Sequence, residues 1–220
     1  MSTEHMLIFT GGDAPHEHVH PHLPNDAFVI AADSGYEHAV HVGQIPHLLV
    51  GDMDSISAKH LADAKVRDIE IIEYASDKDL TDTEIALSAA IERGATSITI
   101  VSGGGDRFDH VIGMLHSLAS FSAQAQTTVF IGSARITFLS PGTSCGIDTI
   151  ADDTISLIPI GGDVVVTTTG LQWNLTNDTL QAFTSRGVSN RATHSTVTIA
   201  STAGTLAIIQ PFFLNSGDPT

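Results

Sequence analysis

The first 125 residues of this 220-residue chain alternate short apolar runs with stretches of helical periodicity. Such alternation is typical of βαβ units, which assemble a parallel sheet covered by helices. The apolar runs span residues 6–10, 28–32, 47–50, 69–72 and 97–101. The helical stretches span residues 35–42, 57–64, 81–93 and 110–122. We therefore predict an N-terminal α/β domain built on a parallel sheet.

The sequence changes character after about residue 130, where helical periodicity disappears and Thr, Ser, Val and Ile dominate. Short apolar runs separated by turn signals span residues 135–139, 154–159, 164–168, 196–200 and 206–210. This pattern indicates an antiparallel β-sandwich. A Ser-, Ala- and Gln-rich stretch at residues 122–128 resembles a linker. We predict an α/β domain over residues 1–125 and a β-sandwich domain over residues 126–220.

The charge balance limits the partners that this chain can have. Its formal net charge is −16, and it has no basic stripe that could displace the counterions of a nucleic acid. The same charge disfavours an anionic membrane surface. The first residues lack the pattern of a signal peptide, and no apolar stretch approaches the ~20 residues of a membrane span. We expect a cytoplasmic protein that binds neither nucleic acid nor membrane.

Carboxylates follow four of the apolar runs in the first half of the chain. They are Asp33, the pair Asp52 and Asp54, the pair Asp79 and Asp82, and Asp109. If the runs are parallel strands, these acids lie along one edge of the sheet, where open α/β sheets bind ligands. So many carboxylates need a cation, and Mg²⁺ is the usual choice for oxygen ligands beside phosphate.

Two loops in this half contain basic residues that suit phosphate. Lys78 and Asp79 precede Thr81, which pairs with Glu84 as a capping box at the start of a helix. The acids there could equally serve the helix dipole alone. The segment Gly103-Gly104-Gly105-Asp106-Arg107-Phe108-Asp109-His110 combines glycines that permit close backbone approach with an arginine able to bind phosphate bidentately. It is neither a dehydrogenase-type dinucleotide motif nor a Walker sequence.

Other conspicuous residues have simpler interpretations. The histidine-rich stretch at residues 16–22 has the composition of a solvated loop. Trp173, the only tryptophan, is expected in the core on general grounds, and Ser189-Asn190 is expected in a polar turn.

Taken together, these motifs resemble the thiamine pyrophosphokinase family. The matching segments are Asp33-Ser34-Gly35, Gly51-Asp52-Met53-Asp54-Ser55, Lys78-Asp79-Leu80-Thr81-Asp82, Arg107-Phe108-Asp109-His110, Gly170-Leu171-Gln172-Trp173-Asn174-Leu175 and Ser189-Asn190. The chain departs from the family pattern at Ser34 and Asp106, where the family usually has glycine.

The resemblance implies a Rossmann-like α/β catalytic domain followed by a β-sandwich that binds thiamine and forms a homodimer, with thiamine at the subunit interface. It implies Mg²⁺ ligation by Asp52, Asp54 and Asp82, with Asp33 and Asp79 in the same catalytic cluster. ATP contacts would fall to Lys78, Asp79, Thr81, Arg107, Asp109 and His110. Thiamine contacts would fall to Trp173, reaching from the partner subunit, and to Ser189 and Asn190.

The implied reaction transfers the diphosphoryl group of ATP to the hydroxyl of thiamine, giving thiamine diphosphate and AMP. Asp33 and Asp79 are both candidates for accepting the hydroxyl proton. Two alternatives use the same residues. One is a Mg²⁺-dependent phosphohydrolase with water as the nucleophile. The other is a thiamine-binding sensor without turnover.

Overall fold

The computed structural model describes residues 4–75, 77, 79–105 and 107–215, which form two compact units. One unit runs to Met114 and includes Val129–Gly132; the other comprises Leu115–Thr128 and the chain from Ser133 onward. The division falls within helix α4 (Phe108–Phe121) and strand β6 (Gln126–Ile131). The stretch at residues 122–128 is therefore not the linker we expected, because it enters β6 at Gln126.

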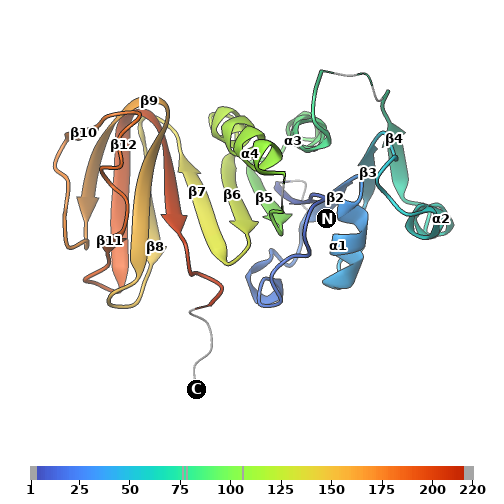
Figure 1. The fold of residues 1–220 in the computed structure, drawn as a ribbon, viewed down its shortest axis with the longest axis horizontal. Helices are drawn as coiled ribbons and strands as arrows, with labels where there is room; N and C mark the ends of the chain where they lie inside the picture. Colours follow the sequence, from blue (N-terminus) through green and yellow to red (C-terminus); the bar gives the residue numbers. More distant parts are fainter. Residues whose placement is uncertain (1–3, 76, 78, 106, 216–220) are drawn as a thin grey trace. The chain divides into compact units, whose positions relative to one another are not determined.

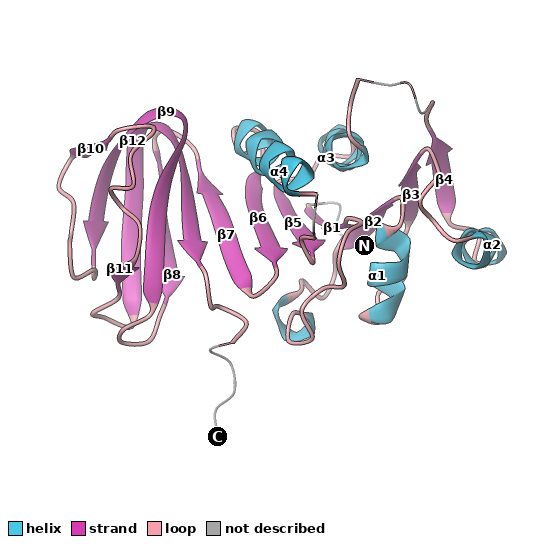
Figure 2. Cartoon of the chain, viewed as in Figure 1, coloured by secondary structure: helices cyan, strands magenta, loops and turns pink. Residues whose placement is uncertain are grey.

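The first unit contains a parallel sheet of five strands. They are β1 (His5–Phe9), β2 (Phe28–Ala32), β3 (Leu48–Gly51), β4 (Glu70–Glu73) and β5 (Ser97–Ser102). Their order in the sheet is β5-β1-β2-β3-β4, and each neighbouring pair is parallel (Figures 1 and 2). The expected N-terminal α/β fold is confirmed.

A short 3-10 helix and three α-helices connect these strands, and a fourth α-helix follows β5 and leads to β6. They are η1 (His20–His22), α1 (Gly35–His41), α2 (Ala58–Val66), α3 (Asp82–Glu92) and α4. The chain moves across the sheet in one direction from β1 to β4 and then returns to β5 on the other side of β1. Because crossovers between parallel strands are right-handed, this return places α3 on the face of the sheet opposite α1 (Figure 1). Strands β1 and β3 are fully buried at Met6–Phe9 and at Leu48–Val50, which accounts for their continuous apolar sequence. In the described part of the chain, no helix is long and apolar enough to cross a membrane.

A buried tyrosine ties α1 to α2. The Tyr36 side chain is fully buried, and its hydroxyl donates a 2.9 Å hydrogen bond to Asp63 Oδ2. Arg67 Nε donates to the same oxygen at 2.7 Å. Burial and the bond to Asp63 raise the pKa of Tyr36 to about 12, so the hydroxyl remains a neutral donor. This contact fixes α1, the helix that begins just after Asp33, against the second helix of the same face.

The second unit is antiparallel. Its strands are β7 (Ala134–Leu139), β8 (Thr143–Asp148), β9 (Thr154–Thr169), β10 (Asp178–Leu180), β11 (Asn190–Arg191) and β12 (Thr196–Gln210). The long strand β12 pairs with β9, with β8 through its first half and with β7 through its second half. Residues from both halves of β9 and β12, such as Leu157, Val166, Val197 and Ile208, share one buried cluster. The expected C-terminal antiparallel β fold is confirmed.

Two pairs of expected strands proved to be single long strands. The runs at residues 154–159 and 164–168 both lie in β9, and those at 196–200 and 206–210 both lie in β12. The glycines between them resemble turn signals, but the β9–β12 register shifts at Ser201–Ala203 and Ala203–Thr205 while pairing continues. Such bulges bend a strand without ending it. Strands β6, β8, β10 and β11 were not expected from the sequence.

The packing of α1 on β1 gives a matched pair of stability predictions. A Cβ added at Gly35 would overlap the carbonyl oxygen of Phe9, which is backbone and cannot move aside. Gly35→Ala should therefore lower the free energy of unfolding by at least ~2 kcal/mol. At Gly113, in the exposed face of α4, an added Cβ meets no atom within 4 Å. Gly113→Ala should raise stability by about 0.5–1 kcal/mol.

Urea unfolding followed by circular dichroism measures both changes. Wild-type stability of the Gly35→Ala protein would contradict the close contact between α1 and the end of β1.

Candidate functional site

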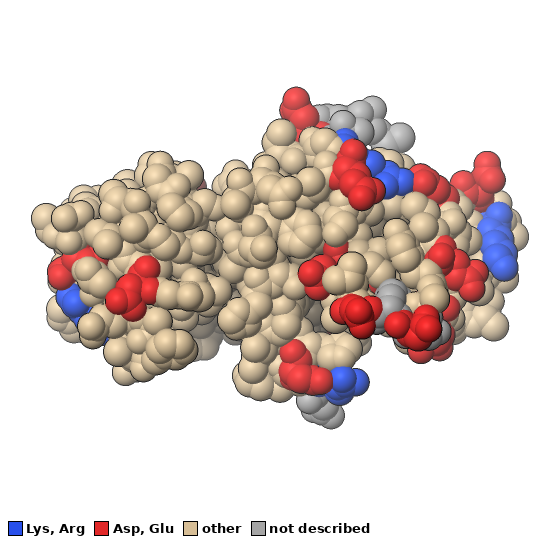
Figure 3. Space-filling view, turned by 90° about the horizontal axis from the view of Figure 1, so that it is seen from above, with Lys and Arg blue, Asp and Glu red and all other residues tan. Residues whose placement is uncertain are grey.

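Three carboxylates meet near the carboxyl ends of β2 and β3. One oxygen from each of Asp33, Asp52 and Asp82 lies within 4.8 Å of the others. Asp33 follows β2, Asp52 follows β3 and Asp82 is the first residue of α3. Asp and Glu side chains are numerous on the face of the α/β unit drawn in Figure 3. The structure thus brings three of the predicted site residues together at one edge of the sheet.

The register of β2 and β3 explains this proximity. Ala32 pairs with Val50, so Asp33 comes beside Gly51 and next to the start of the Asp52 loop. The Asp33 N–H donates a 2.8 Å bond to the Val50 carbonyl, and Asp33 has a positive φ of 51°. Gly51 has a φ of 146°, and a Cβ there would lie 3.1 Å from Asp33 Cβ. Glycine at position 51 therefore leaves the space that the Asp33 side chain occupies.

Asp33 is the most buried member of this group, with 4% of its surface exposed. Burial raises its pKa; a hydrogen bond from Ser55 opposes this, and the neighbouring charges of Asp82 and Asp52 raise it further. Ser55 Oγ donates to Asp33 Oδ2 at 2.7 Å. Asp33 Oδ1 is buried and has no hydrogen-bond partner among the described residues. Two unit charges 4.8 Å apart repel by about 3 kcal/mol at an effective dielectric constant of about 20.

This arrangement fits a divalent cation. Carboxylate oxygens are the ligands that Mg²⁺ prefers, and a cation would remove the repulsion among the three acids. Burying a carboxylate oxygen without a hydrogen bond costs solvation free energy. A bound cation would offset this cost by direct electrostatic attraction. The described histidines of residues 16–22 do not join a comparable three-ligand group.

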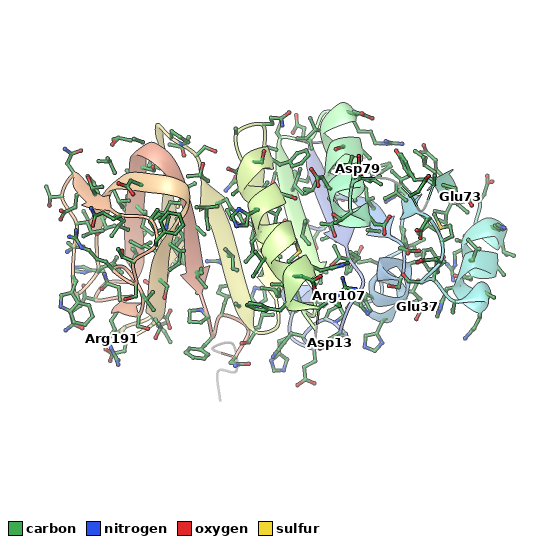
Figure 4. All side chains as sticks on the ribbon, turned by 45° about the horizontal axis from the view of Figure 1, so that its top comes forward. Asp13, Glu37, Glu73, Asp79, Arg107 and Arg191 are labelled. Carbon is green, nitrogen blue, oxygen red and sulfur yellow. The ribbon has the colours of Figure 1, made fainter. Side chains whose placement is uncertain are left out.

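The other acidic candidates lie outside the group of three. Asp54 is exposed, and its backbone N–H donates to Asp52 Oδ1 at 3.2 Å. Asp79 is exposed in the segment before α3 (Figure 4). Thr81 caps α3 as expected, since its Oγ1 accepts a 3.3 Å bond from the Glu84 N–H. Lys78 lies outside the described residues.

The start of α4 presents a compact exposed cluster. Arg107 donates to both carboxylate oxygens of Asp109, at 3.0 and 2.8 Å, and lies 2.7 Å from His110 Nε2. The Arg107 guanidinium holds the pKa of Asp109 well below its usual range. The three predicted residues of this motif are therefore together, with the arginine already paired. Asp106, a departure from the family pattern, lies outside the described residues.

The other departure, Ser34, is compatible with its position. Ser34 occupies the N-cap position of α1 without a side-chain capping hydrogen bond, and its φ of −61° is open to any residue. A glycine is therefore not required between Asp33 and Gly35.

A second glycine loop lies beside the one after β5, and we did not assign it from the sequence. The Asp13 N–H donates to the Gly104 carbonyl at 3.3 Å, which joins the loops after β1 and β5. Figure 4 labels Asp13 and Arg107, one from each loop. The connections from β1 and β5 leave in opposite directions, and ligands bind at such switch points in open sheets. The Gly11-Gly12 pair directly after the first apolar run was the available signal.

In the second unit, Asn190 organises the loop that contains Trp173. The Asn190 side chain is buried; its Oδ1 accepts from the Trp173 N–H at 3.1 Å and its Nδ2 donates to the Trp173 carbonyl at 2.8 Å. Trp173 itself is 58% exposed, so the expectation that this tryptophan lies in the core was wrong. Ser189 is exposed at a positive φ of 60°. The structure brings Trp173 and Asn190 together and gives Asn190 a positioning role that the sequence did not reveal.

Two family models match this chain, one mainly in the α/β unit and one in the antiparallel unit. The model of the thiamin pyrophosphokinase catalytic domain matches residues 19–131, and that of the thiamin pyrophosphokinase vitamin B1 binding domain matches residues 145–206. Thiamine pyrophosphokinase of Bacillus subtilis is 27% identical over 186 residues, covering 82% of this chain and 86% of the relative.

Solved structures of this family have the same fold. The thiamine pyrophosphokinase structure from Bacillus subtilis superposes with a TM-score of 0.83 and 26% identity, over 94% of this chain and 98% of that one. The Geobacillus thermodenitrificans thiamin pyrophosphokinase gives a TM-score of 0.80 and 25% identity, over 94% and 96% of the two chains. Because the catalytic-domain model spans more than half of the residues, this chain belongs to the thiamin pyrophosphokinase family.

Proposed function

We propose that this chain transfers the diphosphoryl group of ATP to the hydroxyl of thiamine, giving thiamine diphosphate and AMP. Family membership supports the reaction, and the group formed by Asp33, Asp52 and Asp82 is the observation on which the proposed chemistry depends. Transfer of a phosphoryl-type group from ATP to a hydroxyl depends on positioning of the substrates and on neutralisation of the phosphate charge more than on covalent catalysis by the protein. An acidic site that holds a cation, next to loops that can approach phosphate, meets this need.

We propose Mg²⁺ as the cofactor. Asp52 and Asp82 would bind it together with Asp33, whose buried Oδ1 lacks a hydrogen bond among the described residues. Asp54 would approach from the exposed side of the same loop. When bound, Mg²⁺ would neutralise phosphate charge and polarise the attacked group.

The ATP phosphates would contact the start of α4 and the start of α3. Arg107 is exposed and forms a fork with Asp109, so phosphate oxygens could take the place of that carboxylate without desolvating a buried charge. His110 lies within hydrogen-bond distance of the same arginine. Asp79, Thr81 and Lys78 would complete the phosphate side, as the resemblance implies.

We assign thiamine to the second unit, within a domain spanning residues 126–220, and ATP with Mg²⁺ to residues 1–125. The exposed ring of Trp173 suits a cationic aromatic ligand, since cation–π contacts contribute about 0.5–2 kcal/mol. Ser189 is exposed beside the buried Asn190 and would supply a polar contact. We also propose a homodimer in which Trp173 serves the thiamine site of the partner subunit, and a cytoplasmic location, where ATP is available.

Product analysis tests this reaction directly. After incubation with ATP, Mg²⁺ and thiamine, AMP and thiamine diphosphate should form in equal amounts, because one diphosphoryl transfer yields one of each. AMP formation should stop when thiamine is omitted. Chromatographic quantification of nucleotides and thiamine species measures both products.

The alternative functions give different products. ADP as the main nucleotide would indicate an ordinary kinase. Phosphate release without thiamine would indicate a hydrolase, and thiamine binding without any turnover would indicate a sensor.

Removal of one acid from the group of three should abolish most of the activity. Asp52→Ala should lower kcat by at least ~10²-fold, since the remaining carboxylates lose part of their shared cation site. Asp26→Ala is the matched control: this exposed acid precedes β2 and loses the same charge outside the site. Steady-state kinetics at saturating Mg²⁺, with circular dichroism to confirm folding, measures the effect. Equal activity of the two variants would contradict the assignment.

Trp173 should report thiamine binding. Trp173 is the only tryptophan and is 58% exposed. Its fluorescence emission should change when thiamine binds, because stacking alters the polarity around the indole. Gln172→Ala, a change at the exposed neighbour, should keep the response. Fluorescence titration measures it, and an unchanged spectrum at thiamine concentrations that saturate turnover would remove Trp173 from the site.

A further inference from the structure

Ser55 donates a side-chain hydrogen bond to the most buried acid of the site. Its hydroxyl donates to Asp33 Oδ2 at 2.7 Å, while Asp33 Oδ1 has no hydrogen-bond partner among the described residues. The two oxygens of one carboxylate are thus placed in different environments. Oδ2 accepts from a neutral donor and Oδ1 does not, and one oxygen of this carboxylate lies within 4.8 Å of an oxygen from each of Asp52 and Asp82.

The loop that carries Ser55 is anchored at both ends. Gly51 ends β3, and Ile56 is buried in the cluster that includes Ala31 and Leu49. Met53 packs partly against the same cluster and turns the chain through a positive φ of 62°. Because hydrophobic residues on either side fix the loop, Ser55 reaches Asp33 with little conformational freedom left to lose.

The Ser55 hydrogen bond restricts the orientation of the Asp33 carboxylate, because it fixes one of the two oxygens at 2.7 Å from the Ser55 hydroxyl. A ligating carboxylate that is oriented by a second hydrogen-bonding residue is a common feature of metal sites.

We propose that Ser55 is a positioning residue, whose hydroxyl holds the Asp33 carboxylate so that Oδ1 faces the bound cation. Ser55 itself touches neither the cation nor the substrates. The inference rests on the proposed metal site and adds a residue to it. The competing interpretation is that Ser55 is only a turn former, as serine often is after aspartate.

Direct metal binding separates these two interpretations. Mn²⁺ alone is titrated into the full-length protein and free Mn²⁺ is followed by electron paramagnetic resonance. Ser55→Ala should raise the Mn²⁺ dissociation constant by about 10- to 100-fold, the usual effect of losing a residue that orients a metal ligand. Ser55→Thr keeps a hydroxyl at this exposed position and should bind within about 3-fold of wild type. The Mg²⁺ concentration for half-maximal turnover should change in the same order.

Ser57→Ala is the matched control. Ser57 lies two residues further on, and its hydroxyl accepts from the His60 N–H at the start of α2. Its removal should lower the melting temperature and leave Mn²⁺ affinity unchanged. Thermal unfolding of all variants without metal separates effects on stability from effects on binding.

Each outcome decides between the two proposals. Wild-type Mn²⁺ affinity in Ser55→Ala, or an equal loss in Ser55→Thr, would overturn the role of the Ser55 hydroxyl. Asp52→Ala is measured alongside. If it loses Mn²⁺ while Ser55→Ala retains it, only the Ser55 inference fails. If the wild type binds no Mn²⁺, or if Asp52→Ala binds it as tightly as the wild type, the metal site fails, and the Ser55 role fails with it.

Discussion

Like charges held within 4.8 Å of one another repel, and the α/β unit overcomes this repulsion by fixing each acid to a different rigid element. Asp33 is tied to the end of β2 by its N–H bond to Val50, and Asp52 begins the loop after β3. Asp82 opens α3, where the helix dipole favours a negative charge. The cost of bringing the acids together is therefore met by strand pairing, helix packing and capping, which do not depend on the acids.

The backbone turns sharply at Asp33, between the end of β2 and the start of α1. Asp33 adopts a positive φ, and Gly51 leaves room for its side chain, so the chain turns out of β2 directly into α1. Tyr36 then anchors α1 against α2 through Asp63. A buried carboxylate at such a tight turn is costly for a purely structural role, and this supports a functional one.

Much of this architecture could be predicted because it follows from hydrophobic pattern. The five parallel strands and four helices correspond to apolar runs and helical periodicity, and the acids that follow the runs mark the same edge of the sheet. The prediction was wrong where glycines typical of turns lie inside continuous strands. Gly161 and Gly204 resemble turn residues, yet they lie within long strands that bend at bulges.

The roles of Ser55 and Asn190 were also hidden, because each depends on a partner distant in the sequence. Ser55 binds Asp33 across 22 positions, and Asn190 holds Trp173 across 17. From the sequence alone, serine after aspartate and asparagine in a polar segment indicate only turns. The exposure of Trp173 likewise follows from how the surrounding strands pack, which composition does not encode.

Charge finally limits how the proposed substrates can approach. With a net charge of −16 and an acidic group at its site, the chain repels a free nucleotide triphosphate and attracts cationic thiamine. Arg107 is paired with Asp109 through two hydrogen bonds, so it would relieve this repulsion only after phosphate oxygens displaced that carboxylate. A cation between the proposed phosphates and the carboxylates would remove much of the repulsion at this edge of the sheet. We therefore expect the proposed site to favour metal-bound over metal-free nucleotide, because of the same repulsion that the fold must overcome to bring the three acids together.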